Sequence, residues 1–158
     1  MYTKIIAEGG INHNGDMSVA RGLIDAAVVA GCDYIKWQKR NPDLCVPEHQ
    51  KDKPKSTPWG EMTYLDYKKK IEFGKKEYDE IFDYCEGRIK CFASVWDKDS
   101  VDFMSPHTGI AKIPSALITN GGVELFKYFI AFSKFCALKL LKSAVGILYF
   151  FINCLANN

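Results

Sequence analysis

The chain of 158 residues has the composition of a globular domain, with 47% hydrophobic and 25% charged residues and a net charge of only +2. A chain of this length can bury a normal hydrophobic core. Its basic residues are scattered, which argues against nucleic acid as a partner. Its most apolar stretch, Ser143–Leu155, is shorter than the roughly 20 residues that a membrane-spanning helix needs, so no membrane span is expected.

The cysteines predict reduced thiols rather than disulfides or a metal site. No C-x-x-C pair occurs, and no signal peptide precedes the first expected strand. Thiols of this kind are typical of a reducing compartment and are usually buried as small hydrophobes, so we expect a cytoplasmic protein. The six residues are Cys32, Cys45, Cys85, Cys91, Cys136 and Cys154.

The chain begins with a predicted strand, a helix and a second strand. Lys4–Glu8 is apolar, β-branched and too short for a helix, so we expect a strand. Asp16 is a typical N-cap for a helix that reaches about Ala30, and Gly31 is a typical C-terminal stop. The next strand is expected at Asp33–Gln38, where alternation places alternate side chains on opposite faces.

The following elements repeat this order after a long polar segment. Lys39–Phe73 has no strong periodicity and is interpreted as a functional loop or lid. A helix is expected at Lys75–Glu86, a strand at Cys91–Val95, a short helix at Asp97–Met104 and a strand at Ile110–Ile113. The order βαβαβαβ predicts an α/β protein with a parallel sheet, either doubly wound or a (β/α)8 barrel.

The C-terminal part differs in character from the rest, and we therefore divide the chain into residues 1–122 and a divergent, apolar tail at residues 123–158. The tail is expected to be helical, with lysines spread over one broad arc in its first half. Three interpretations stay open for it: a buried core helix, a helix at a membrane interface, or a non-native end caused by truncation or a frameshift.

Charged and polar side chains stand in the predicted strands, where burial would make them costly without a partner. Lys36 lies within a strand that should be buried on both faces, and Gln38 lies two residues further on the same face. Glu8 ends the first strand as a lone carboxylate and must meet a partner or a ligand. A lysine at such a position is satisfied by an anion.

The later strands repeat this pattern. Lys112 lies in the fourth expected strand, and Ser115 follows it as a hydroxyl donor. Ser94 lies in the third. Ligands of parallel α/β sheets bind at the carboxyl ends of the strands. Two lysines and two hydroxyls there predict a small phosphorylated or carboxylated substrate, without naming the reaction.

The turn after the first strand, Asn12-His13-Asn14-Gly15, is typical of a tight connection. A metal-binding role for His13 is not favoured, because no second ligand stands at a recognisable spacing.

The sequence resembles the N-acetylneuraminate (sialic acid) synthase family in five blocks that occur in the right order. They cover about residues 3–120. The blocks are I-I-A-E-x-G-I-N-H-N-G-D at Ile5–Asp16, I-K-W-Q-K-R at Ile35–Arg40, T-P-W-G-E-M-T-Y-L-D-Y at Thr57–Tyr67, F-A-S-V-W-D at Phe92–Asp97, and K-I-P-S-A-L-I-T-N at Lys112–Asn120.

This resemblance implies a (β/α)8 barrel enzyme, a transferase that condenses phosphoenolpyruvate with an N-acetylated amino sugar, usually N-acetylmannosamine. The products are a nonulosonic acid and phosphate. A divalent metal, typically Mn²⁺ or Mg²⁺, polarises the aldehyde of the sugar. The methylene carbon of phosphoenolpyruvate attacks this aldehyde, water adds to the resulting cation, and phosphate leaves by C–O cleavage.

The resemblance also implies roles for individual residues. Glu8 matches the family carboxylate near the reacting end of the sugar, and Lys36 matches a position at the phosphoenolpyruvate; we take both as catalytic candidates. The substrate-binding candidates are Gln38, Ser94, Lys112 and Ser115.

Other parts of the family pattern have no match. The histidines that bind the metal belong to later strands, so no metal ligand is assigned in this chain, and the C-terminal antifreeze-like domain is also missing. A whole barrel takes about 250 residues. We therefore expect about the first half of a barrel, from an enzyme that would be a homodimer at full length, and activity of the chain by itself is in doubt.

Two alternatives remain open. The chain is a non-catalytic barrel fragment that serves as an interaction module, or it belongs to a synthase of the legionaminate or pseudaminate type. The loop at Trp59–Tyr67 is where we expect the choice of sugar to lie.

Overall fold

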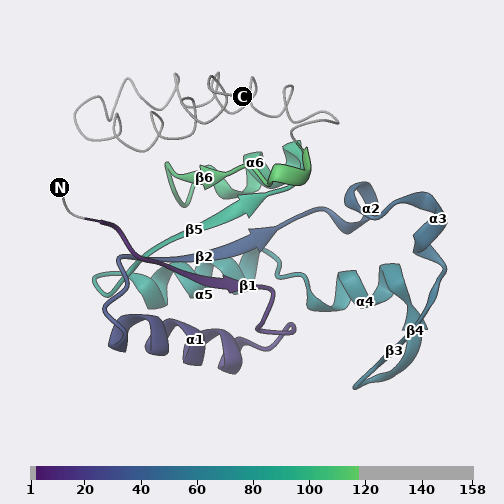
Figure 1. The fold of residues 1–158 in the computed structure, drawn as a ribbon, viewed down its shortest axis with the longest axis horizontal. Coiled ribbons are helices and arrows are strands. Elements are labelled where there is room, and N and C mark those ends of the chain that lie inside the picture. The colour runs from purple at the N-terminus through teal and green to yellow at the C-terminus, as the bar shows by residue number, and fades with distance from the viewer. Residues whose placement is uncertain (1–2, 118–158) are drawn as a thin grey trace.

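The computed structural model describes residues 3–117, in which four parallel strands form a sheet in the order β1-β2-β5-β6 (Figure 1). The strands are β1 (Ile6–Gly10), β2 (Tyr34–Lys39), β5 (Lys90–Val95) and β6 (Ala111–Lys112). Each strand is followed by a helical crossover or a turn, as the predicted βαβαβαβ order requires. The prediction of a parallel α/β sheet is confirmed, and closure into a barrel stays a prediction.

The crossover helices begin at capping side chains that the sequence supplies. In α1 (Met17–Val29), the Asp16 carboxylate accepts from the backbone N–H of Ser18 at 2.7 Å, and Gly31 follows the helix with φ of +72°. In α6 (Lys98–Met104), the Asp97 carboxylate accepts from the Ser100 N–H at 2.7 Å. These helices and α5 (Lys75–Cys85) occupy the places that their patterns predict.

The hydrophobic core lies on one face of the sheet and includes residues of α1, α5 and α6; Figure 1 shows α1 and α5 on the same side of the sheet. Trp37 in β2 is its largest fully buried side chain. A Cβ atom added to Gly9 in β1 would stand only 2.7 Å from the Trp37 ring. The Trp37 indole therefore occupies the space that a side chain at position 9 would need. Further core residues on this face are Ile24, Ile35, Tyr78, Ile81, Ala93, Val95, Val101 and Met104.

The segment that we interpreted as a functional loop or lid, residues 39–73, has secondary structure of its own, and its functional role stays a prediction. This segment, which we call the 41–71 excursion, contains helices and strands of four to eight residues, which are too short to give a clear periodic pattern. It projects beyond the end of β2, away from the sheet (Figure 1). Its elements are α2 (Pro42–Cys45), α3 (Glu48–Lys51), the antiparallel hairpin of β3 (Pro54–Thr57) and β4 (Gly60–Thr63), and α4 (Tyr64–Ile71).

The strand boundaries differ slightly from those predicted. β1 begins two residues later and ends two residues later than the predicted Lys4–Glu8, so Gly9 and Gly10 lie within the strand. β6 is two residues long, and a 3₁₀ turn, η1 (Ser115–Leu117), follows it. No helix within residues 3–117 is long and apolar enough to cross a membrane. The tail predicted at residues 123–158 lies outside the described residues.

Candidate functional site

Five of the six predicted site residues meet on the face of the sheet opposite the core, and we call them the polar face (Glu8, Lys36, Gln38, Ser94 and Lys112). The parallel register explains this arrangement. Glu8 pairs with Lys36 across β1 and β2, and Gln38, Ser94 and Lys112 form one row across β2, β5 and β6. Partners in register point to the same face, so the polar residues of four strands converge.

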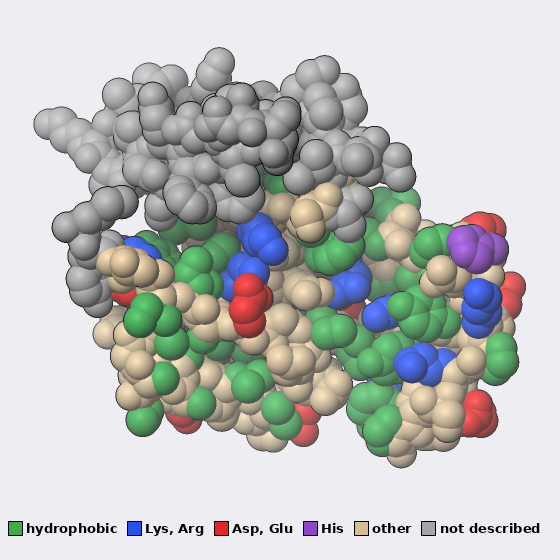
Figure 2. Space-filling view, viewed as in Figure 1, with side chains coloured by type: hydrophobic (Ala, Val, Ile, Leu, Met, Phe, Trp, Pro, Cys, Tyr) green, Lys and Arg blue, Asp and Glu red, His purple; other side chains and the backbone are tan. Residues whose placement is uncertain are grey.

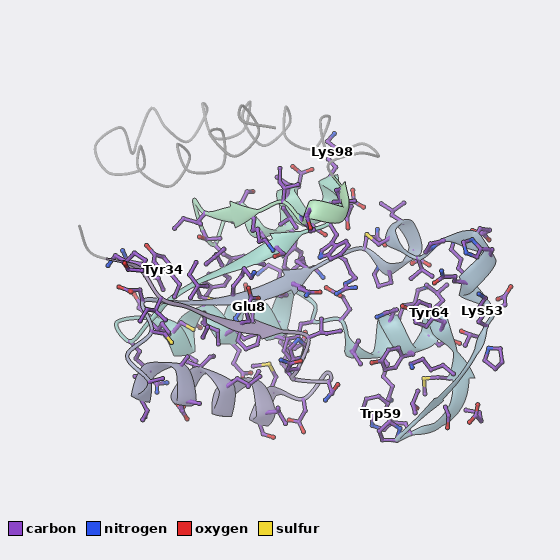
Figure 3. The ribbon with its side chains drawn as sticks, viewed as in Figure 1. Glu8, Tyr34, Lys53, Trp59, Tyr64 and Lys98 are labelled. Atoms are coloured by element: carbon purple, nitrogen blue, oxygen red, sulfur yellow. The ribbon has the colours of Figure 1, made fainter. Side chains whose placement is uncertain are left out.

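An ion pair joins the first two of these residues. The Lys36 ammonium group donates to the Glu8 carboxylate, which Figure 3 labels on β1. Only 6% of the Lys36 side chain is exposed, whereas 66% of the Glu8 side chain is exposed. A buried lysine needs a counter-charge. Glu8 supplies it from the solvent side, where a ligand can also reach it.

A second lysine stands close to the first. Burial lowers the pKa of Lys112, and the neighbouring ammonium group of Lys36 lowers it further, while the Glu8 carboxylate acts in the opposite direction. In the middle of Figure 2, blue basic side chains adjoin a red acidic one. Two neighbouring ammonium groups with one carboxylate leave an excess of positive charge on the polar face. This surplus favours an anionic ligand.

The two serines lie in different environments. Ser94 is buried in β5, between Gln38 and Lys112 in the row. Ser115 is exposed and opens η1, outside the sheet, so the structure does not bring it into the polar face. Ser94 therefore belongs to the polar face, and a substrate-binding role for Ser115 stays a prediction.

Sequence reasoning missed two charged residues that lie behind Gln38. Arg40 donates from Nη2 to the Gln38 side-chain oxygen, and Glu72 accepts from the backbone N–H of Arg40 at 3.1 Å. Glu72 also accepts from the Lys39 ammonium group at 3.1 Å. Burial raises the pKa of Glu72, and the charges of Lys39 and Arg40 oppose this rise. The signal for Arg40 was its place directly after a strand, but no sequence pattern pointed to Glu72 as its partner.

His13 fixes the turn between β1 and α1 and is 2% exposed. Its Nδ1 accepts from the Gly15 N–H at 3.0 Å, and its ring stacks on Phe73 with the centroids 3.7 Å apart. Burial lowers the pKa of His13 to about 4. The neutral imidazole is thus a structural acceptor, and its Nδ1 is occupied by the turn.

We expect this histidine to make the protein lose stability in mild acid. His13 is protonated in the unfolded chain below its ordinary pKa of 6.5 but resists protonation when folded until about pH 4. The stability that the protein gains from a neutral His13 is therefore complete above pH 6.5 and is lost as the pH falls towards 4. From this shift we expect a loss of about 2–3 kcal/mol at pH 4.5.

Urea unfolding at pH 7 and pH 4.5 measures this effect, with His13→Gln as the control. The glutamine oxygen can accept a hydrogen bond but does not titrate. The variant should start less stable at pH 7 and should lose less on acidification than the parent chain, since both share all other titrating groups. Equal losses in both proteins would contradict this account.

The described residues do not fit a divalent metal. Among residues 3–117 no group of three or more His, Cys, Asp or Glu side chains converges. On the polar face Glu8 is the lone carboxylate, and it is paired with Lys36. We therefore assign no metal ligand in this part of the chain.

Comparison with known proteins finds one matching family profile and several relatives that are named as synthases. The profile of the NeuB family matches residues 23–138. The N,N'-diacetyllegionaminic acid synthase of Campylobacter jejuni is 34% identical over 122 residues, which are 75% of this chain and 36% of that protein. The N-acetylneuraminate-9-phosphate synthase of Homo sapiens is 31% identical over 128 residues, which are 78% of this chain and 34% of that protein.

A solved structure agrees. The sialic acid synthetase of Leptospira borgpetersenii, determined in complex with citrate, superimposes with a TM-score of 0.65 at 29% identity. The match covers 78% of this chain and 39% of that one. The chain spans about a third of the length of the curated relatives named above. Together with the five sequence blocks and the polar face, these matches show that the chain belongs to the NeuB family.

Proposed function

We propose that this chain carries the anion-binding part of a nonulosonic acid synthase, an enzyme that joins phosphoenolpyruvate to an N-acetylated amino sugar. The observation that carries the proposal is the pair of lysines, Lys36 and Lys112, from β2 and β6, on one face of a NeuB-family sheet. Their ammonium groups suit the phosphate and carboxylate of phosphoenolpyruvate, with Gln38 and Ser94 as further polar contacts.

The reaction makes one carbon–carbon bond and releases phosphate. The methylene carbon of phosphoenolpyruvate bonds to the aldehyde carbon of the sugar, water adds to the cation that is left, and the C–O bond to phosphate breaks. In this proposal Glu8 faces the reacting end of the sugar, and Lys36 neutralises the charge of the phosphoenolpyruvate. The family resemblance implies a divalent metal in the whole enzyme, which would polarise the aldehyde of the sugar. Residues 3–117 offer no set of ligands for this metal.

The proposed substrate is a class of sugar, the N-acetylated amino sugars, and not one particular sugar. The two relatives named above are called a legionaminic acid synthase and a neuraminate-9-phosphate synthase, and a pseudaminic acid synthase of Campylobacter jejuni is 30% identical over 110 residues. These identities are too similar to choose among N-acetylmannosamine and its relatives. The rival function is a barrel segment that acts only as an interaction module and binds no substrate.

Calorimetric titration of the 158-residue chain with phosphoenolpyruvate, with and without Mn²⁺, separates these functions. We expect micromolar binding that does not depend on Mn²⁺, because the residues that meet the anion are present and metal ligands are not among them. Pyruvate and inorganic phosphate each lack one of the two charged groups and should bind at least about tenfold more weakly. A folded sample that binds none of the three would favour the interaction module.

A further inference from the structure

Arg40 joins a candidate substrate-binding residue to a buried carboxylate. Its Nη2 donates to the side-chain oxygen of Gln38 on the polar face. Its Nε lies 3.6 Å from one carboxylate oxygen of Glu72, and its backbone N–H donates to the other at 3.1 Å. Glu72 therefore accepts a hydrogen bond from the backbone of Arg40 and forms an ion pair with its side chain.

The Glu72 end of this chain of contacts is buried and has further partners. The Glu72 side chain is 8% exposed, and it accepts from the Lys39 ammonium group at 3.1 Å. The same ammonium group donates to the Phe73 carbonyl at 2.8 Å. On the other side, the Arg40 guanidinium lies over the Trp96 ring at 5.2 Å from its centroid. The guanidinium therefore lies between the Glu72 carboxylate and the Trp96 ring, and its Nη2 donates to Gln38.

The contact with Arg40 decides which way round the Gln38 carboxamide lies. A guanidinium group donates hydrogen bonds and cannot accept them, so it must meet the amide oxygen of Gln38. The amide nitrogen then points elsewhere. A Cβ atom added to Gly10 would stand 3.8 Å from this nitrogen, which places the NH₂ group beside the end of β1. There it can donate to an acceptor.

We propose that Arg40 and Glu72 are positioning residues, which fix the Gln38 carboxamide so that its NH₂ group donates to an oxygen of the carboxylate or phosphate of the bound anion. This inference rests on the proposed function for the identity of the anion. The fixed orientation itself is a property of the unliganded chain. Glu72 directly follows the last helix of the 41–71 excursion, so its carboxylate connects the end of this excursion to Arg40.

The orientation is tested first without any ligand. In the ¹⁵N-labelled 158-residue chain, the side-chain NH₂ signals of Gln38 are identified by their loss in Gln38→Ala. We expect them to differ from those of a free glutamine side chain and to move towards that position in Arg40→Met, with a smaller shift in Glu72→Gln. Lys75→Met, an exposed change on α5, is the control. Signals unaffected by Arg40→Met would overturn the proposal.

The second test measures phosphoenolpyruvate affinity in a double-mutant cycle. Arg40→Met should weaken binding about tenfold in the parent chain and should have no effect when Gln38 is already alanine. The same loss in both backgrounds would mean that Arg40 acts elsewhere and would overturn the proposal. Pyruvate and inorganic phosphate, titrated into Gln38→Ala, identify which anionic group the amide meets. A parent chain that binds none of these ligands defeats the proposed function, while the NMR result still decides the orientation.

Discussion

Replacing Trp37 by alanine is expected to lower the free energy of unfolding by about 3–5 kcal/mol, as is usual for a large aromatic residue removed from a core. Trp37 is fully buried between β1 and the helical layer. Its Nε1 donates to the Cys91 sulfur at 3.2 Å, so truncation also removes the hydrogen-bond partner of a buried thiol. The cavity borders Gly9, which has no side chain to fill it.

Urea unfolding followed by circular dichroism measures this loss, and the chain offers a matched control. Trp59 lies at the tip of the β3–β4 hairpin, where it is 45% exposed and is covered in part by the Lys70 ammonium group (Figure 3). Trp59→Ala should cost less than about 1 kcal/mol, because surface substitutions seldom cost more. Losses of similar size in the two variants would mean that the core does not depend on Trp37.

Replacing Lys36 by methionine is expected to weaken phosphoenolpyruvate binding at least about 30-fold, because a buried hydrogen bond to a charged group is lost together with the charge. Lys112→Met should act in the same direction. Stability should stay the same or rise, since methionine fills the volume without the cost of burying a charge. The former partner, Glu8, is 66% exposed and can return to water.

Calorimetry of Lys36→Met, Lys112→Met and Lys75→Met separates a local effect from one of net charge. Lys75 lies on α5, where it pairs with Asp79 at 2.6 Å, and the side chain is 76% exposed. All three variants lose one positive charge, but only the first two change the polar face. Unchanged affinity in Lys36→Met, or an equal loss in Lys75→Met, would contradict the assignment of this face.

Much of the sheet could be predicted because its signals are local. Alternation in β2 placed Lys36 and Gln38 on one face and Trp37 on the other, and the structure confirms it. Asp16 and Gly31 marked the ends of α1 through the preferences of single residues at helix ends. The helices and strands of the 41–71 excursion were not predicted, because they are only four to eight residues long. Elements this short depend on packing against one another rather than on periodicity.

The site was predictable only where strand order and alternation decide it. Glu8, Lys36 and Lys112 were expected at neighbouring strands, and parallel pairing brings them to one face. Glu72 could not be found in this way, because its contact with Arg40 spans 32 residues and crosses the excursion. Ser115 follows β6 closely in sequence, but it is exposed in η1 and has no partner in the strand register, so strand alternation does not place it on the polar face.

The close approach of Gly9 to Trp37 has a consequence for how this sequence can change over time. A larger residue at position 9 has no space while the indole remains, because an added Cβ would stand 2.7 Å from the ring. A smaller residue at position 37 would open that space. The two positions are therefore linked, and a substitution at one should be tolerated best when it follows or accompanies a compensating change at the other. In a set of descendants the summed volume of the pair, rather than either residue, is the quantity that selection on stability would preserve.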